Sequence, residues 1–96
     1  MEREESKIRA NVIVSGRVQG VFFRAETKRA AENEGVTGWV KNRSDGTVRA
    51  LFEGNEVSVH AMVEWCKEGS PHSKVKDVKV EWEEYQGEFD EFEITY

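Results

Sequence analysis

The residues with the clearest potential for chemistry lie in the segment from Gly16 to Arg24, Gly-Arg-Val-Gln-Gly-Val-Phe-Phe-Arg. Gly16 and Gly20 mark a turn from a strand into a helix, where unpaired backbone N–H groups and the positive helix end converge and a phosphate can bind. Arg24 strengthens this interpretation, because a cation in the first helical turn is unfavourable by roughly a few tenths of a kcal/mol unless an anion lies beside it. Alternatively, the glycines only reverse the chain, and Arg24 points into solvent or pairs with an acidic neighbour such as Glu26.

A second segment, Gly38 to Val48, ends a β-rich run with the amide side chain of Asn42, just before a turn. Alternate residues of a strand share a face, so Asn42 lies on the same face as Val40, a natural core residue. The face with Val40 is the one under the helices, which places Asn42 in the same layer as Arg24. The alternative is that Asn42 only starts the turn with an Asx-type hydrogen bond.

Other residue types that often perform chemistry are present but isolated. Cys66 is the only cysteine, which excludes an internal disulfide, and with His60 and His72 it cannot make a zinc site. Both histidines lie far in sequence from the two segments, and Cys66 is expected in the core. The acidic run from Glu81 to Glu93 is typical of a solvated face rather than a metal site. No metal and no cofactor are therefore expected.

Length and charge limit the possible organisation and partners. The 96 residues predict one domain spanning residues 1–96, because two would each fall below about 40 to 50 residues. The net charge of −5 and pI near 5.1 disfavour nucleic acid and membrane partners unless a basic patch is concentrated somewhere, and none is visible. Residues 1–7 are charged, are expected to be flexible and precede no apolar run of signal or membrane-spanning length. A cytoplasmic monomer is expected by default.

Patterns of apolar residues divide the chain into the elements that must position these groups. Ile8 to Ser15 alternates between apolar and polar residues apart from Ile13, as in a strand covered on one face. Phe23 to Glu34 has a helical repeat and no proline, and Gly35 follows its end. Two β-rich runs, Val36 to Asn42 and Thr47 to Glu53, flank an Asp-Gly turn that predicts a hairpin.

The second half of the chain continues this order. Asn55 can cap a helix that runs to Glu68, and Gly69 follows it. Its apolar face is predicted to carry Val59, Met62, Val63 and Cys66. Alternation from Val78 to Trp82 and from Phe92 to Tyr96 predicts two further strands. The order βαββαβ plus a short C-terminal strand predicts a ferredoxin-like α+β fold, an α/β sandwich whose mostly antiparallel sheet is covered on one face by two helices.

Taken together, the two segments resemble the signatures of the acylphosphatase family, G-x-V-Q-G-V-x-F-R and G-[aromatic]-V-x-N-x-x-x-G-x-V. They stand here as Gly16 to Arg24 and Gly38 to Val48, with no departure from either pattern. The element order and length extend the resemblance over Ile8 to Tyr96. It implies a hydrolase acting on acid anhydrides, which cleaves the carboxyl–phosphate bond of small acyl phosphates without a metal.

The resemblance also implies roles for individual residues. Arg24 would bind the substrate phosphate, and Asn42 would orient the attacking water. Thr47 and Tyr96 are possible supporting residues, since the terminal carboxylate approaches the catalytic arginine in this family. A small acyl phosphate is the expected partner, with inorganic phosphate as product and inhibitor. The remaining substrate-binding residues would be Gly16, Arg17, Val18, Gln19, Gly20, Val21, Phe22 and Phe23.

Three other interpretations remain open. The first is a module that belonged to, or serves, a carbamoyl-transfer enzyme of hydrogenase maturation, which the absence of a downstream domain disfavours. The second is a non-catalytic ligand-binding or regulatory module of the same fold, which would not need both Arg24 and Asn42. The third is an RNA-binding sheet, but its basic and aromatic ribonucleoprotein motif is missing and the net charge has the wrong sign.

Overall fold

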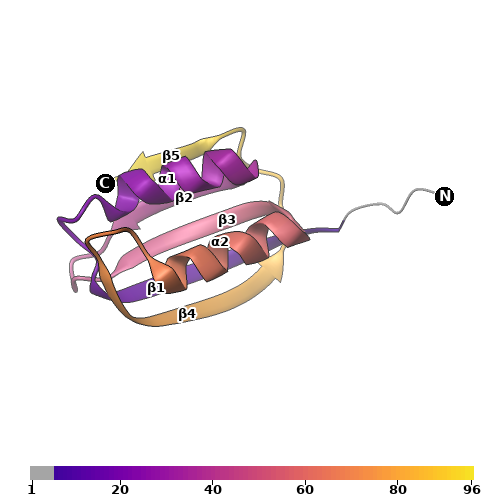
Figure 1. Ribbon diagram of the computed structural model, residues 1–96. Coiled ribbons are helices and arrows are strands. Elements are labelled where there is room, and N and C mark those ends of the chain that lie inside the picture. Colours follow the sequence, from indigo (N-terminus) through magenta and orange to yellow (C-terminus); the bar gives the residue numbers. More distant parts are fainter. Residues whose placement is uncertain (1–5) are drawn as a thin grey trace.

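The computed structural model describes residues 6–96 and has two layers, a five-stranded sheet and two helices that lie on one of its faces (Figure 1). The strand order is β4-β1-β3-β2-β5, and only β2 and β5 pair in parallel. The ferredoxin-like fold expected from the sequence is confirmed. The elements are β1 (Lys7–Arg17), α1 (Phe23–Glu34), β2 (Thr37–Asn42), β3 (Val48–Asn55), α2 (Glu56–Glu68), β4 (Lys74–Glu84) and β5 (Phe92–Thr95).

The core lies between the sheet and the helices, where the alternation of β1 places it. Ala10, Val12 and Val14 are fully buried on the helix side, and they face Phe52, Ala50 and Val48 of β3, which are buried as well. Burial of such side chains is the main favourable term in folding and sets the strand register, because a slip of one residue would expose the whole set.

The N-terminus and β1 differ from expectation in extent. Of residues 1–7, expected to be flexible, residues 1–5 lie outside the described part of the chain. The backbone oxygen of Ser6 accepts a hydrogen bond from the Glu56 N–H at 2.9 Å, and Lys7 is the first residue of β1. At its other end β1 continues to Arg17 through a register shift between Ser15 and Gly16, which alternation alone does not reveal.

Both helices have the limits that their sequences predict. Gly35 follows α1 in a left-handed conformation with φ 72°. Asn55 occupies the N-cap of α2, but its side chain makes no capping hydrogen bond; the first helical N–H group, that of Glu56, donates to the Ser6 oxygen. The predicted apolar face of α2 is buried, and burial raises the pKa of the Cys66 thiol to about 12, which makes the thiol unreactive. No helix within residues 6–96 is long and apolar enough to cross a membrane.

A buried carboxylate on the face of the sheet without helices holds the connection between β4 and β5. Glu53 is fully buried and accepts hydrogen bonds from the backbone N–H groups of Gln86 at 2.8 Å and Glu88 at 3.3 Å. The guanidinium of Arg9 lies 3.5 Å from the same carboxylate. Because a buried charge is tolerated only when it is paired and hydrogen-bonded, these contacts fix the segment that leads into β5.

Gly16 is required by the β-bulge that ends β1. Its φ is +119°, and a Cβ there would lie 2.2 Å from the Lys74 carbonyl oxygen and 2.6 Å from the Lys76 nitrogen. We expect Gly16→Ala to lower the free energy of unfolding by about 3 kcal/mol, through backbone strain and overlap with β4. Gly35→Ala is the matched control: its φ is +72° with nothing within 4 Å of the added Cβ, so only about 1 kcal/mol should be lost. Equal losses in urea denaturation would contradict this explanation.

Candidate active site

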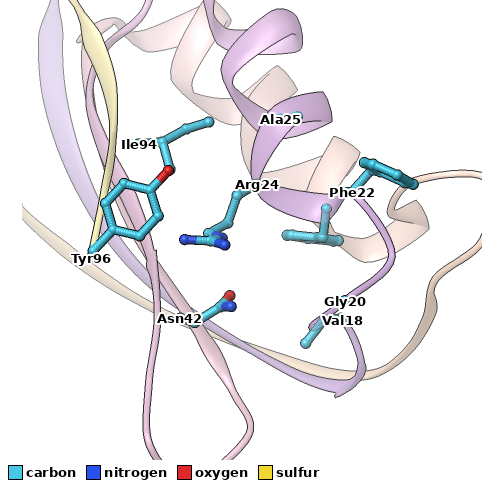
Figure 2. A pocket seen from close by; sticks show the side chains of 9 residues that line it. Val18, Gly20, Phe22, Arg24, Ala25, Asn42, Ile94 and Tyr96 are labelled. Atoms are coloured by element: carbon cyan, nitrogen blue, oxygen red, sulfur yellow. The ribbon is translucent and has the colours of Figure 1, made fainter.

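A cavity of about 350 Å³ opens beside the first turn of α1 and the end of β2 (Figure 2). Three parts of the chain meet there: the loop from β1 into α1, the last residue of β2, and the C-terminal strand. In Figure 2 the guanidinium of Arg24 and the amide of Asn42 both point into the cavity. The lining residues are Val18, Gly20, Phe22, Phe23, Arg24, Ala25, Asn42, Ile94 and Tyr96.

The structure thus brings together most, but not all, of the residues singled out in the sequence. Gly16, Arg17, Gln19, Val21 and Thr47 are not part of the lining, whereas Ala25 and Ile94 are and were missed. Ala25 directly follows Arg24, so its place in the first helical turn was an available signal. Ile94 lies beside Val40 because β5 pairs with β2, a neighbour relation that the alternation of a strand does not contain.

The loop backbone alternates in a way that suits an anion. Gly20 has φ 72° and Phe22 has φ 61°, while Val21 between them does not have a positive φ. Successive N–H groups in such alternating conformations point into one concavity and can bind an anion. Within residues 6–96, the N–H groups of residues 19–23 donate no hydrogen bond, so they are available to a ligand.

Phe22 occupies this left-handed conformation at a cost. It is the one non-glycine residue with positive φ among residues 6–96, which is unfavourable by about 1 to 2 kcal/mol. Its side chain is 77% exposed, so burial of the ring does not offset the strain. The strain marks this loop as a candidate binding segment, since strained residues cluster at binding sites.

The guanidinium of Arg24 is held by an aromatic ring rather than by an acid. Its Cζ atom lies 4.9 Å from the centroid of the Tyr96 ring, and no carboxylate within residues 6–96 forms an ion pair with it. Pairing with Glu26, the alternative considered from the sequence, does not occur. The contact with Tyr96 runs through the ring, not through the terminal carboxylate. A cation–π contact orients the guanidinium and leaves its N–H donors available.

Asn42 carries a buried oxygen, Oδ1, that has no hydrogen-bond partner within residues 6–96. The turn does not need it: the Arg43 N–H donates to the Thr47 oxygen at 2.8 Å, and the Asx-type bond is made by Asp45 with the Thr47 N–H at 3.0 Å. The turn-starting alternative for Asn42 is therefore wrong. Because an unsatisfied buried oxygen is unfavourable by about 1 to 3 kcal/mol, its orientation into the cavity calls for a role there.

Thr47 belongs to the hairpin turn. Its hydroxyl donates to Asp45 Oδ1 at 2.6 Å. This bond and then the Thr47 backbone N–H lower the pKa of Asp45 below 3.8, and the charge of Arg43 acts in the same direction. Because folding lowers the pKa of Asp45, its carboxylate stabilises the folded protein at pH values above the unfolded-state pKa. This stabilisation is lost as the pH falls through the pKa that Asp45 has in the folded protein.

Replacing Thr47 by valine tests whether the Thr47 hydroxyl lowers the pKa of Asp45. Thr47→Val removes the hydroxyl donor and keeps the backbone donor, so the pKa of Asp45 should rise toward 3.8 without reaching it. An NMR titration of the side-chain carboxyl carbon between pH 2 and pH 6, a range of about two units on either side of an ordinary aspartate, measures it. Thr37→Val is the matched control, because the Thr37 hydroxyl donates to the backbone oxygen of Glu53 at 3.4 Å, in another part of the sheet. An unchanged pKa in Thr47→Val would contradict the assignment.

The fold and cavity define a small ferredoxin-like α+β protein whose site offers a guanidinium, a carboxamide and main-chain donors. The acylphosphatase family model matches residues 10–94. An acylphosphatase of Pelotomaculum thermopropionicum is 52% identical over 91 residues, which cover 95% of this chain and 99% of that protein. The chain belongs to the acylphosphatase family, and is thus a hydrolase acting on acid anhydrides.

Solved structures agree with this assignment. The crystal structure of acylphosphatase from Bacillus subtilis superimposes with a TM-score of 0.89 at 43% identity, covering 93% of this chain and 99% of that one. HypF from T. kodakarensis is also similar, with a TM-score of 0.80 and 26% identity, but the match covers only 12% of that chain. More than nine-tenths of this chain therefore corresponds to nearly the full length of small acylphosphatases and to a small part of a larger protein.

Proposed function

We propose that this chain hydrolyses the carboxyl–phosphate bond of small acyl phosphates, releasing a carboxylate and inorganic phosphate without a metal ion. The observation that carries the proposal is the convergence of Arg24 and Asn42, from different elements, on one cavity beside the available N–H groups of the loop. Arg24 and Asn42 are the proposed catalytic residues.

The phosphate would be bound by the loop and by Arg24. The N–H groups of residues 19–23 and the N-terminus of α1 supply partial positive charge, and the guanidinium supplies a full charge with several donors. In phosphoryl transfer the negative charge lies on the equatorial oxygens, and catalysis consists mainly of in-line positioning and electrostatic stabilisation. This arrangement of donors suits those oxygens.

The water would be aimed by Asn42. Its buried Oδ1 can accept one hydrogen bond from the water, and its amide nitrogen remains able to donate another. A phosphate oxygen of the substrate can take the proton of the attacking water, so no basic side chain is needed. The asparagine thus orients the water and does not titrate.

The leaving group explains why two side chains suffice. An acyl phosphate expels a carboxylate, whose conjugate acid has a pKa of about 4 to 5, so the enzyme need not protonate it. A general acid is therefore dispensable, as is a metal ion to stabilise the departing oxygen. The apolar remainder of the cavity wall, which includes Ala25 and Ile94, can accommodate the acyl group.

Substitution of the two proposed catalytic residues should change different quantities, phosphate affinity in one case and kcat in the other. Arg24→Ala should weaken binding of inorganic phosphate by on the order of tenfold to a hundredfold, because a charged hydrogen-bond donor is lost. Asn42→Ala should lower kcat about a hundredfold or more and leave phosphate affinity nearly intact, because it touches the water and not the phosphate. Calorimetric titration with phosphate and steady-state hydrolysis of benzoyl phosphate measure the two effects.

Matched controls for both substitutions come from α1, the helix that carries Arg24. Arg29 and Asn33 are exposed residues of α1 that do not line the cavity, so Arg29→Ala and Asn33→Ala should leave both quantities unchanged. If Arg24→Ala binds phosphate as tightly as the unmodified protein, the proposed role of the arginine is wrong. If Asn42→Ala keeps its kcat, the proposed role of the asparagine is wrong.

Dependence on the leaving group tests the chemistry itself. Acetyl and benzoyl phosphate should be hydrolysed at an undiminished rate in EDTA. Alkyl phosphate monoesters should react at least about a thousandfold more slowly, because their poor leaving groups need the protonation that this site does not supply. Loss of activity in EDTA, or comparable rates for both classes, would contradict the mechanism. Absence of any acyl phosphate hydrolysis would favour the non-catalytic binding module instead.

A further inference from the structure

The side chain of Gln19 makes contacts that the proposed function does not use. Only its backbone N–H belongs to the candidate phosphate loop, and its side chain does not line the cavity. Its amide nitrogen, Nε2, donates instead to two backbone oxygens of the β2–β3 hairpin, those of Arg43 and Thr47, both at 2.8 Å. The loop that faces the phosphate is thereby tied to the hairpin that begins next to Asn42.

The order of the strands shows why the contact between Gln19 and the hairpin matters for the site. The loop follows β1 and Asn42 ends β2, but β3 lies between these two strands. Pairing of β1 with β3 ends at Val14 and Val48, and beyond that point β1 pairs only with β4, on the side away from β2. Within residues 6–96, no main-chain hydrogen bond outside the strands connects residues 18–22 with residues 42–48. The Gln19 side chain bridges this gap.

The two oxygens that Gln19 reaches belong to the most constrained part of the hairpin. The Arg43 oxygen also accepts from the Gly46 N–H at 3.2 Å, and the Thr47 oxygen also accepts from the Arg43 N–H at 2.8 Å. The glutamine amide thus donates to the two residues, Arg43 and Thr47, whose backbone groups close the turn by hydrogen bonding. Arg43 is the residue directly after Asn42. A shift of the loop relative to Asn42 would break both bonds.

We propose that the Gln19 side chain is a positioning residue that fixes the distance between the phosphate loop and Asn42. The inference rests on the proposed function, in which the loop binds phosphate and Asn42 aims the water. In-line attack requires the reacting atoms to be about 3 to 3.5 Å apart and aligned, and a misplacement of about 1 Å can lower the rate on the order of a hundredfold. Gln19 acts through the placement of Asn42 and touches neither water nor substrate.

Two substitutions separate positioning from phosphate binding. Gln19→Met keeps the side-chain length and removes both donors. Gln19→Glu keeps the shape and places a carboxylate against two carbonyl oxygens. Both variants should lower kcat by roughly tenfold to a hundredfold, and Gln19→Met should bind inorganic phosphate within about twofold of the unmodified protein, since its loop N–H groups and Arg24 are unchanged.

Gln86→Ala is the matched control. The Gln86 amide also donates to a backbone oxygen, that of Glu84 at 3.3 Å, but in the connection after β4, away from the cavity. This variant should keep kcat and phosphate affinity. Circular dichroism verifies that each variant is folded, and Gln19→Ala replaces Gln19→Met if the longer apolar side chain prevents folding.

A double-mutant cycle with Asn42→Ala decides whether Gln19 acts through Asn42. If it does, the substitution of Gln19 should lower kcat by less than about twofold once Asn42 is already alanine. The same relative loss in both backgrounds, a joint fall of kcat and phosphate affinity in Gln19→Met, or an unchanged kcat would overturn the inference. These outcomes are distinct from failure of the proposed function, which would appear in the Asn42→Ala single variant as an undiminished kcat.

Discussion

Pairing of β3 with both β1 and β2 is the constraint on which the site depends. Val48, fully buried, lies opposite Val14 of β1 on one side and opposite Asn42 of β2 on the other. This row places Val14, close to the end of β1, level with Asn42, the last residue of β2, so the loop that follows β1 and the Asn42 side chain lie at the same edge of the sheet. Because register is specified by the buried face, the hydrophobic core indirectly determines which edge of the sheet carries the groups of the polar site.

Local features of the site are unfavourable on their own and are maintained by this framework. Phe22 is left-handed and its side chain is exposed, so burial does not compensate the strain, and the Asn42 oxygen is buried without a partner in the described chain. Each costs roughly 1 to 3 kcal/mol, a considerable share of the about 5 to 15 kcal/mol by which domains of this kind are stable. Both unfavourable features lie at the candidate site. A bound anion would offset the cost of the Phe22 conformation and a bound water would pair with the Asn42 oxygen, which is the pattern of a site preorganised for its ligand.

The sequence predicted those features that depend on local patterns. The limits of α1 were correct because its apolar repeat and the following Gly35 agree, and Asn42 was placed under the helices because strand alternation has a strict period of two. Features that depend on which segments become neighbours were not predictable. The pairing of β5 with β2, which brings Ile94 into the cavity, is set by sheet packing.

The remaining differences concern hydrogen bonds between residues that lie far apart in the sequence. Asn55 has the residue type and position of a helix cap, yet its side chain makes no capping hydrogen bond, and the first N–H group of α2 donates to the Ser6 oxygen, far away in sequence. Gln19 was expected to bind the substrate as part of the loop, whereas its side chain donates to the hairpin, 24 and 28 residues along the chain. A polar side chain that can bond to several backbone groups does not indicate from its type alone which of them it meets.

The small size of the site matches the small size of the domain. A chain of 96 residues buries a modest fraction of its surface, so it can offset only a few unsatisfied or strained groups. Main-chain N–H groups at a helix start add donors without adding buried side chains, and a single guanidinium held against the Tyr96 ring needs no buried counter-ion. A reaction with a poor leaving group would require a general acid with a shifted pKa, and therefore further burial and further polar partners. For a leaving group that departs as a carboxylate, the proposed pair of one cation and one carboxamide would need no such additions.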